Sequence, residues 1–307
     1  MKHCLSKRIF LVIFLITSFI ASSSAKIILP SVFSDNMVLQ QNSEVAIWGW
    51  SIPGEAVKIV AGWNASDTVK VKADNTAAWK TTIKTGKAGG PYTIQIIGEG
   101  GLELKNVMLG EVWICSGQSN MEMNVGWNIF NGEEEAAKAN HPNIRIFNIP
   151  KIGAEQPQQD CRATWTVCSP ETMRATSAVG YFFARQLQEK LNVPVGIIVT
   201  CWGGTPAEVW IEKSRIETNP ELNKDIYNEQ HGGWPGNPGV CYNSMIFPVI
   251  PYGIAGAIWY QGESNCSNYQ IYANLMKTLI DNWRTDFKKD FPFYFVQIAP
   301  FNYGENG

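Results

Sequence analysis

The stretch Gly110–Met123, GEVWICSGQSNMEM, decides the fold. The apolar run Leu109–Cys115 predicts a buried strand, and the segment Ser116-Gly117-Gln118-Ser119-Asn120 after it predicts a tight turn. Open parallel sheets bind their ligands at the carboxyl ends of the strands. Ser119 therefore occupies a position where a nucleophile is displayed, although a Gly-x-Ser turn alone is usually only a turn.

Strands and helices alternate downstream of Met108. Ser177–Leu191 has the apolar spacing of an amphipathic helix. Val195–Thr200 shows no polar alternation, which predicts a strand buried on both faces. This alternation of strands and helices predicts a doubly wound parallel α/β sheet over residues 108–307. The other predicted elements are strands at Ile144–Phe147, Ile254–Trp259 and Phe293–Ile298 and helices at Glu133–Ala139 and Asn268–Trp283.

Residues 26–107 follow a different pattern. Short apolar or alternating runs, such as Val45–Trp50 and Tyr92–Ile97, are separated by turn residues such as Pro53-Gly54. No long helical pattern interrupts them. Short strands at regular spacing with glycine and proline between them predict an N-terminal β-sandwich domain.

The first 25 residues have the layout of a secretory signal peptide. Lys2, Lys7 and Arg8 precede the apolar run Ile9–Ile20, and small residues up to Ala25 follow it. The apolar run is shorter than the roughly 20 residues that span a bilayer, so a signal anchor is the weaker alternative. We expect cleavage after Ala25, a secreted or periplasmic protein, and no membrane association after cleavage.

Composition excludes some classes of partner and cofactor. The formal net charge is −2 and no lysine- or arginine-rich block occurs, so nucleic acid is not an expected partner.

Cys161 and Cys168 are the best candidates for a disulfide in an exported protein, with free buried thiols an equal alternative. No CxxC occurs and only His141 and His231 follow residue 25, so neither a zinc site nor another cofactor is predicted. The oligomeric state is not indicated.

Two further predicted strands end in unusual sequence. CWGGT (201–205) follows one and YQGESN (260–265) follows the other. A Gly-Gly turn can aim bare N–H groups at an oxyanion, and a glutamine amide can add another donor. Each motif alone usually forms an ordinary loop or turn without a catalytic role. Together, at the ends of adjacent strands, they would supply a serine nucleophile with an oxyanion hole.

The chain resembles the sialate O-acetylesterase family, a branch of the SGNH (GDSL-like) esterases, over nearly its whole length after residue 25. Many separate motifs occur in the family's order, which makes the resemblance specific. They are LPSVFSDNMVLQQ (29–41), VAIWGWSIPGEAV (45–57), GEVWICSGQSNMEM (110–123), SAVGYFFARQL (177–187), VPVGIIVTCWGGTPAEVW (193–210), YNSMIFPVI (242–250), GAIWYQGESN (256–265) and FPFYFVQIAP (291–300).

The resemblance implies an SGNH-hydrolase-like domain and a role for individual residues. Ser119 matches the family's nucleophile. Gly203 or Gly204 matches the glycine that donates an N–H to the oxyanion, and both remain candidates. Gln261 stands where the superfamily has an asparagine side-chain donor.

Three further residues complete the candidate site. Asn120 and Glu263 are expected to support the turn, with local turn hydrogen bonding as the alternative. Trp234, in a Gly/Pro-rich loop, is the candidate platform for a sugar ring, with core packing as the alternative.

One family feature is missing. The family's base is a histidine in an Asp-x-x-His motif near the end of the catalytic domain, and no Asp-x-x-His occurs in residues 1–307. His231 lies in the loop HGGWPGNPG and is a weak alternative base. We interpret the chain as truncated at its C-terminus and catalytically incomplete.

The leading hypothesis is an exported carbohydrate O-acetylesterase that forms an acyl-enzyme at Ser119. Acetylated sialic acid and acetylated polysaccharides such as xylan are equally good substrates on this reasoning. The main alternative is a secreted, non-catalytic carbohydrate-binding protein, because the histidine segment is absent. A lipase-type SGNH enzyme is less favoured because no apolar lid segment is seen.

We predict that residues 26–307 hydrolyse acetyl esters at least about 10³-fold more slowly than a chain extended through an Asp-x-x-His segment. A serine hydroxyl is a poor nucleophile without a base, and losing one member of a triad has effects of this size. Assays of both chains with p-nitrophenyl acetate test this. Equal kcat values would place the base within residues 26–307, and His231 would be the first residue to substitute.

Overall fold

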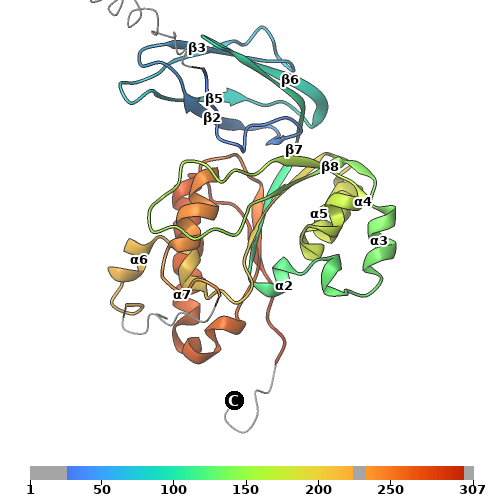
Figure 1. The fold of residues 1–307 in the computed structure, drawn as a ribbon, viewed down its shortest axis with the longest axis vertical. Helices are drawn as coiled ribbons and strands as arrows, with labels where there is room; N and C mark the ends of the chain where they lie inside the picture. The colour runs from blue at the N-terminus through green and yellow to red at the C-terminus, as the bar shows by residue number, and fades with distance from the viewer. Residues whose placement is uncertain (1–25, 224–232, 301–307) are drawn as a thin grey trace, which may run out of the picture.

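A computed structural model describes residues 26–223 and 233–300 as a mixed α/β protein (Figure 1). The predicted signal peptide and His231 lie outside the described residues. The strands β2–β6 gather at one end of the molecule, and the helices surround the remaining strands at the other end. No helix among the described residues is long and apolar enough to cross a membrane.

The central element is β7 (Leu102–Gly117), a strand of 16 residues. Its first half pairs antiparallel with β6 (Gly89–Ile97), and at Met108–Gly110 it also pairs with β1 (Val38–Gln40). Its second half pairs in parallel with β10 (Val195–Cys201) on one side and β11 (Gly256–Tyr260) on the other. The predicted boundary between residues 107 and 108 therefore falls inside one continuous strand.

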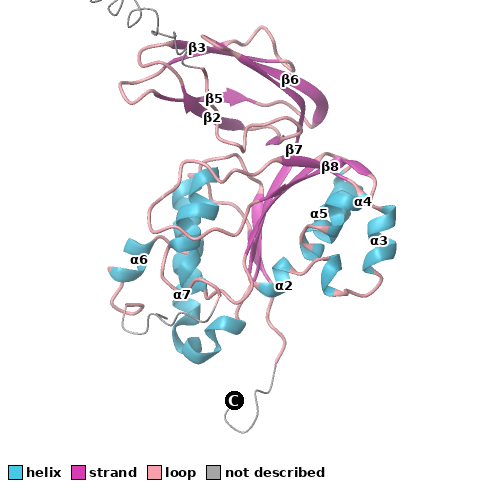
Figure 2. Ribbon diagram, in the orientation of Figure 1, coloured by secondary structure: helices cyan, strands magenta, loops and turns pink. Residues whose placement is uncertain are grey.

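The second half of β7 lies in a row of strands with the order β9–β8–β10–β7–β11–β12, and only β9 runs antiparallel to its neighbour. The predicted parallel α/β sheet is confirmed. Helices cover both of its faces, α5 on one side and α7 on the other (Figure 2). The strands not yet given bounds are β8 (His141–Asn148), β9 (Trp165–Cys168) and β12 (Phe293–Phe295).

Side chains alternate between two cores across this sheet. In β7, Val112 and Ile114 pack into one buried cluster, while Trp113 and Cys115 pack into the other. Every residue of β10 is buried. A strand covered on both faces has no reason to alternate apolar with polar residues, which is why Val195–Thr200 reads as continuously apolar.

The predicted amphipathic helix is present as α5 (Ala178–Leu191). The Ser177 hydroxyl accepts a hydrogen bond from the N–H of Gly180 and caps the helix, and Asn192 in the left-handed conformation ends it. The other helices are α2 (Ser119–Glu122), α3 (Gly132–Lys138), α4 (Pro170–Arg174), α6 (Lys213–Glu217) and α7 (Tyr269–Phe287).

The N-terminal strands form two groups. β2 (Glu44–Trp50) pairs with β5 (Ala78–Lys84) as a separate two-stranded sheet. β4 (Val69–Lys72) and β3 (Ala56–Ala61) extend through β6 into β7. Short strands with glycine turns are confirmed in this region, whereas the β-sandwich domain stays a prediction.

The cysteines after residue 25 are all free thiols in the structure. Of the two equal alternatives, the Cys161–Cys168 disulfide is therefore not formed, and both cysteines are buried free thiols. Cys161 lies against the hydroxyl of Ser31, while Cys168 sits on β9 opposite His141. Burial raises the pKa of both thiols to about 11, so both remain protonated at neutral pH.

Gly117 controls how closely β7 and β11 approach at their carboxyl ends. Its φ is +138°, in the region that favours glycine. A Cβ placed on Gly117 would lie 2.1 Å from the carbonyl oxygen of Tyr260. The backbone approach therefore requires glycine at this position.

We predict that Gly117→Ala lowers the free energy of unfolding by at least about 2 kcal/mol, because the methyl group collides with a strand backbone. Urea unfolding measures the loss. Gly86→Ala is the matched control, because a Cβ there meets no atom within 4 Å. Equal stability of the two variants would show that the β7–β11 approach is not as close as described.

Candidate active site

The site lies where three parallel strands end side by side. Cys201 of β10 and Tyr260 of β11 are both in register with Gly117 of β7. The N–H of Gln118 donates to the carbonyl of Tyr260 at 3.0 Å, and the N–H of Trp202 donates to that of Gly117 at 3.1 Å. The adjacency on which the sequence argument depended is therefore present, and the three motifs meet at one edge of the sheet.

Ser119 is the first residue of α2 and is partly exposed. Gly203, after β10, is its close neighbour, since a Cβ on Gly203 would lie 3.4 Å from the Cβ of Ser119. A larger residue would crowd the serine at this point. The structure thus brings together Ser119 and one of the two predicted glycines.

Gly204 has a different environment from Gly203. It adopts φ +78°, and a Cβ there would lie 2.4 Å from the indole ring of Trp234. The indole ring of Trp234 therefore packs directly against Gly204, whereas Gly203 faces Ser119. Of the two candidates that the sequence left open, Gly203 is the one placed next to Ser119.

The N–H of Gly203 is already engaged. It donates to Glu122 Oε2 at 2.5 Å, and Glu122 Oε1 lies 2.5 Å from Lys151 Nζ. Neither Glu122 nor Lys151 was singled out from the sequence. Glu122 follows Ser119 by three positions on α2, a spacing that places both on one side of a helix, and this was a usable signal.

Gln261 is buried and held by hydrogen bonds on both sides of its amide. Its Nε2 donates to Asn265 Oδ1 at 2.7 Å and to the carbonyl of Thr205 at 3.3 Å. Its Oε1 accepts from the Tyr272 hydroxyl at 2.8 Å. In this structure both amide hydrogens are committed within the protein, so a bond to an oxyanion would have to replace one of them.

Asn120 and Glu263 are paired, as expected for residues that support the turn. Asn120 Nδ2 donates to Glu263 Oε1 at 2.5 Å, which joins α2 to the loop after β11. The second carboxylate oxygen of Glu263 is buried and has no hydrogen-bond partner among the described residues. An unsatisfied buried carboxylate oxygen is costly, which marks this position as one that a further donor would stabilise.

Two buried residues that sequence reasoning missed tie the loops together. Gln118 Oε1 accepts from the N–H groups of Gly262 and Ser264, at 3.4 and 3.2 Å. Glu208, fully buried, accepts from the side-chain amides of Asn265 and Asn268.

Burial raises the pKa of the Glu208 carboxyl. A glutamate inside the apolar run of PAEVW was the available signal, because a charge is rarely buried unless it is satisfied by partners.

Trp234 and Trp202 line a cavity of about 470 Å³ beside the loop that carries Gly203. Trp234 is 45% exposed. A partly exposed indole that lines a cavity is available to contact a ligand there, and its role as a platform for a sugar ring stays a prediction.

His141, the one described histidine, lies away from Ser119. His141 begins β8 and bonds to the Tyr181 hydroxyl at 3.2 Å. Because β8 runs parallel to β10, its first residue is at the opposite edge of the sheet from Ser119. Within residues 26–223 and 233–300, no group of three or more His, Cys, Asp or Glu side chains could hold a metal ion.

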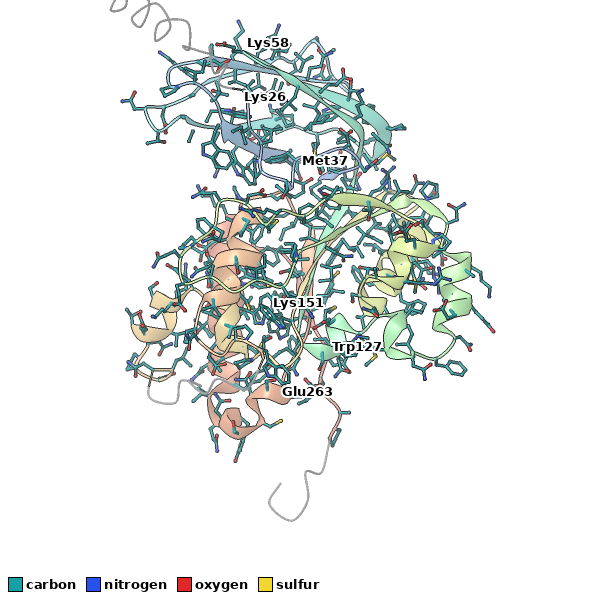
Figure 3. All side chains as sticks on the ribbon, in the orientation of Figure 1. Lys26, Met37, Lys58, Trp127, Lys151 and Glu263 are labelled. Carbon is teal, nitrogen blue, oxygen red and sulfur yellow. The ribbon has the colours of Figure 1, made fainter. Side chains whose placement is uncertain are left out.

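Figure 3 shows Lys151 and Glu263 in the same half of the molecule, the half that holds α2, and Lys26 and Lys58 in the β-rich half. The cluster around Ser119 is thus far from the N-terminal strands. It has a serine on a turn, a neighbouring backbone donor, a buried amide and an aromatic cavity. A serine hydroxyl and N–H donors are the kinds of group that acyl-transfer chemistry uses.

Comparisons with known proteins agree with this geometry. The family model for carbohydrate esterase, sialic acid-specific acetylesterase, matches residues 109–306. The chain is 32% identical over 301 residues to a sialate O-acetylesterase from Homo sapiens and 30% identical over 325 residues to one from Mus musculus. Each match covers 88% of this chain, and they cover 56% and 60% of the relatives. The chain thus spans less than two thirds of their length.

A solved structure is also similar. A carbohydrate acetylesterase from Xanthomonas citri superposes with a TM-score of 0.78 at 34% identity, covering 88% of this chain and 60% of that protein. Its similarity extends over the α/β sheet and the N-terminal strands alike, since little of the chain is left unmatched. The chain belongs to the sialic acid-specific acetylesterase family of carbohydrate esterases.

Proposed function

We propose that this protein removes acetyl groups from sugar hydroxyls by forming an acetyl-enzyme at Ser119. The observation that carries the proposal is the contact of Ser119 with Gly203 at the junction of β7 and β10. Membership of the family favours this activity over the non-catalytic carbohydrate-binding alternative.

The reaction follows from the groups at the site. The Ser119 Oγ attacks the acetyl carbon while a base takes its proton, and the oxyanion that forms requires N–H donors. Collapse of the tetrahedral intermediate breaks the bond to the sugar oxygen, which receives the proton. Water then attacks the acetyl-enzyme by the same route and releases acetate. The family resemblance implies a histidine of an Asp-x-x-His segment as the base.

The substrate proposal is an acetylated carbohydrate, sialic acid or a polysaccharide, with Trp234 as the stacking platform. The aromatic cavity beside Gly204 supports this proposal. A sugar ring offers C–H groups that can pack against the apolar face of an indole.

We further propose that residues 1–25 direct export and that residues 26–107 form a β-sandwich domain. The basic start and the apolar run Ile9–Ile20 support export. The separate β2–β5 sheet next to the β4–β3–β6 strands supports a two-layer arrangement.

Ser119→Ala is expected to abolish both labelling by a fluorophosphonate probe and the hydrolysis of p-nitrophenyl acetate by the chain extended through an Asp-x-x-His segment, because the acylated oxygen is removed. Mass spectrometry of the labelled wild type locates the adduct. Ser66→Ala, at an exposed serine of the N-terminal region, is the control and should label fully. Unchanged labelling of Ser119→Ala would refute the assignment of the nucleophile.

Gln261→Ala is expected to lower kcat by about 10²–10³-fold with a small change in KM, the usual effect of losing one oxyanion donor. We propose that the amide exchanges its longer bond, the one to Thr205 at 3.3 Å, for the oxyanion. Steady-state kinetics with p-nitrophenyl acetate measure the effect.

The control for Gln261 is Gln159→Ala, which truncates an exposed glutamine far from Ser119. If Gln261→Ala keeps near-full kcat, Gln261 is not an oxyanion donor and only stabilises the loop after β11.

A further inference from the structure

The backbone donor next to Ser119 is blocked by an anion that belongs to the protein. The N–H of Gly203 has one hydrogen, and Glu122 Oε2 accepts it at 2.5 Å. The Glu122 side chain is 17% exposed, so water competes little for this bond. A tight bond between a backbone N–H and a carboxylate is stronger than one between neutral groups.

The acyl oxygen of a substrate and Glu122 cannot use this donor at the same time. The oxygen gains negative charge in the transition state, and a carboxylate at hydrogen-bond distance from the same N–H would repel it. An oxyanion hole that includes Gly203 can therefore form only if Glu122 turns away.

The structure provides a place for the displaced carboxylate. A cavity of about 250 Å³ adjoins Glu122 and is lined by polar side chains, among them Asn124, Asn148, Lys151 and Ser177. Lys151 already holds the other oxygen of the carboxylate, and its side chain is 46% exposed. Rotation of Glu122 toward Lys151 keeps the ion pair while it releases Gly203, so the carboxylate never loses its cationic partner.

We propose that Glu122 is a gating residue that occupies the Gly203 donor in the resting enzyme and yields it to the acyl oxygen of the substrate, with Lys151 retaining the carboxylate in the open state. This inference rests on the proposed function, because it concerns the same oxyanion. Part of the binding free energy of the substrate is then used to open the gate, which raises KM.

The test is Glu122→Gln in the chain extended through an Asp-x-x-His segment. The glutamine Oε1 can still accept from Gly203, but it carries no charge and has no ion pair with Lys151. A neutral acceptor is displaced more easily, so KM for p-nitrophenyl acetate should fall by about 5-fold while kcat is kept or raised. Glu122→Ala removes the acceptor and should lower KM at least as much.

Glu135→Gln is the matched control. Glu135 pairs with Arg185 at the same 2.5 Å distance, on the helices α3 and α5 away from the three strand ends. Its KM should equal that of the wild type. An unchanged or higher KM in Glu122→Gln, or a loss of kcat in both Glu122 variants, overturns the gate.

A second measurement does not depend on turnover. The amide proton of Gly203 should resonate far downfield in the wild type, move upfield in Glu122→Gln, and shift again when a fluorophosphonate modifies Ser119, because the donor changes partner. A Gly203 resonance that is the same in wild type and Glu122→Gln would overturn the proposal even if a variant were poorly active.

The two proposals fail in different ways. If the probe does not label Ser119, the proposed esterase function is refuted and the gate with it. If Ser119 is labelled but the Gly203 resonance does not change on labelling, the function stands and the gate alone is refuted.

Discussion

The close contact of β7 with the backbones of β10 and β11 at Gly117 is the constraint on which the rest of the site depends. Because Gly117 has no side chain, Tyr260 can approach it, and the loops after all three strands then converge. Each loop brings one group that the others lack: a serine, the backbone N–H of Gly203, which Glu122 occupies, and a buried amide. Without this approach the same residues would be three unrelated turns.

The loops are stiffened by polar side chains that do not themselves react. Gln118 binds two backbone N–H groups of the neighbouring loop, and Glu208 binds two side-chain amides. Such buried polar networks are favourable only when their members are satisfied. The cost of burying Glu208 is offset by its donors, and the result is a site whose loops are fixed before a substrate arrives.

Sequence patterns predicted the elements well where one physical signal dominates. The helix at 177–191 and the strand at 195–200 differ from α5 and β10 by single residues, because amphipathic spacing and continuous burial are both strong signals. The continuity of β7 was missed, since its polar first half and apolar second half read as two strands. The two halves form one strand because of the strands they pair with, which local composition does not reveal.

At the site, too, the sequence could not predict features that depend on which distant segments lie next to one another. The sequence placed Ser119 and the Gly-Gly turn together, yet it could not separate Gly203, which lies beside Ser119, from Gly204, which has a positive φ and lies against Trp234. The bond from Gly203 to Glu122 depends on the position of a loop 81 residues away in the chain. Likewise, the spacing of Cys161 and Cys168 suggested a pair, but their strands and loops place them against different neighbours.

The length of β7 has a mechanical consequence. The strand is hydrogen-bonded to β6 in its first half, to β1 at Met108–Gly110, and to β10 and β11 in its second half. It therefore joins the N-terminal strands covalently, without a loop, to the sheet that carries Ser119. A cut between residues 107 and 108 would divide this strand and leave unpaired strand edges, which are prone to aggregation.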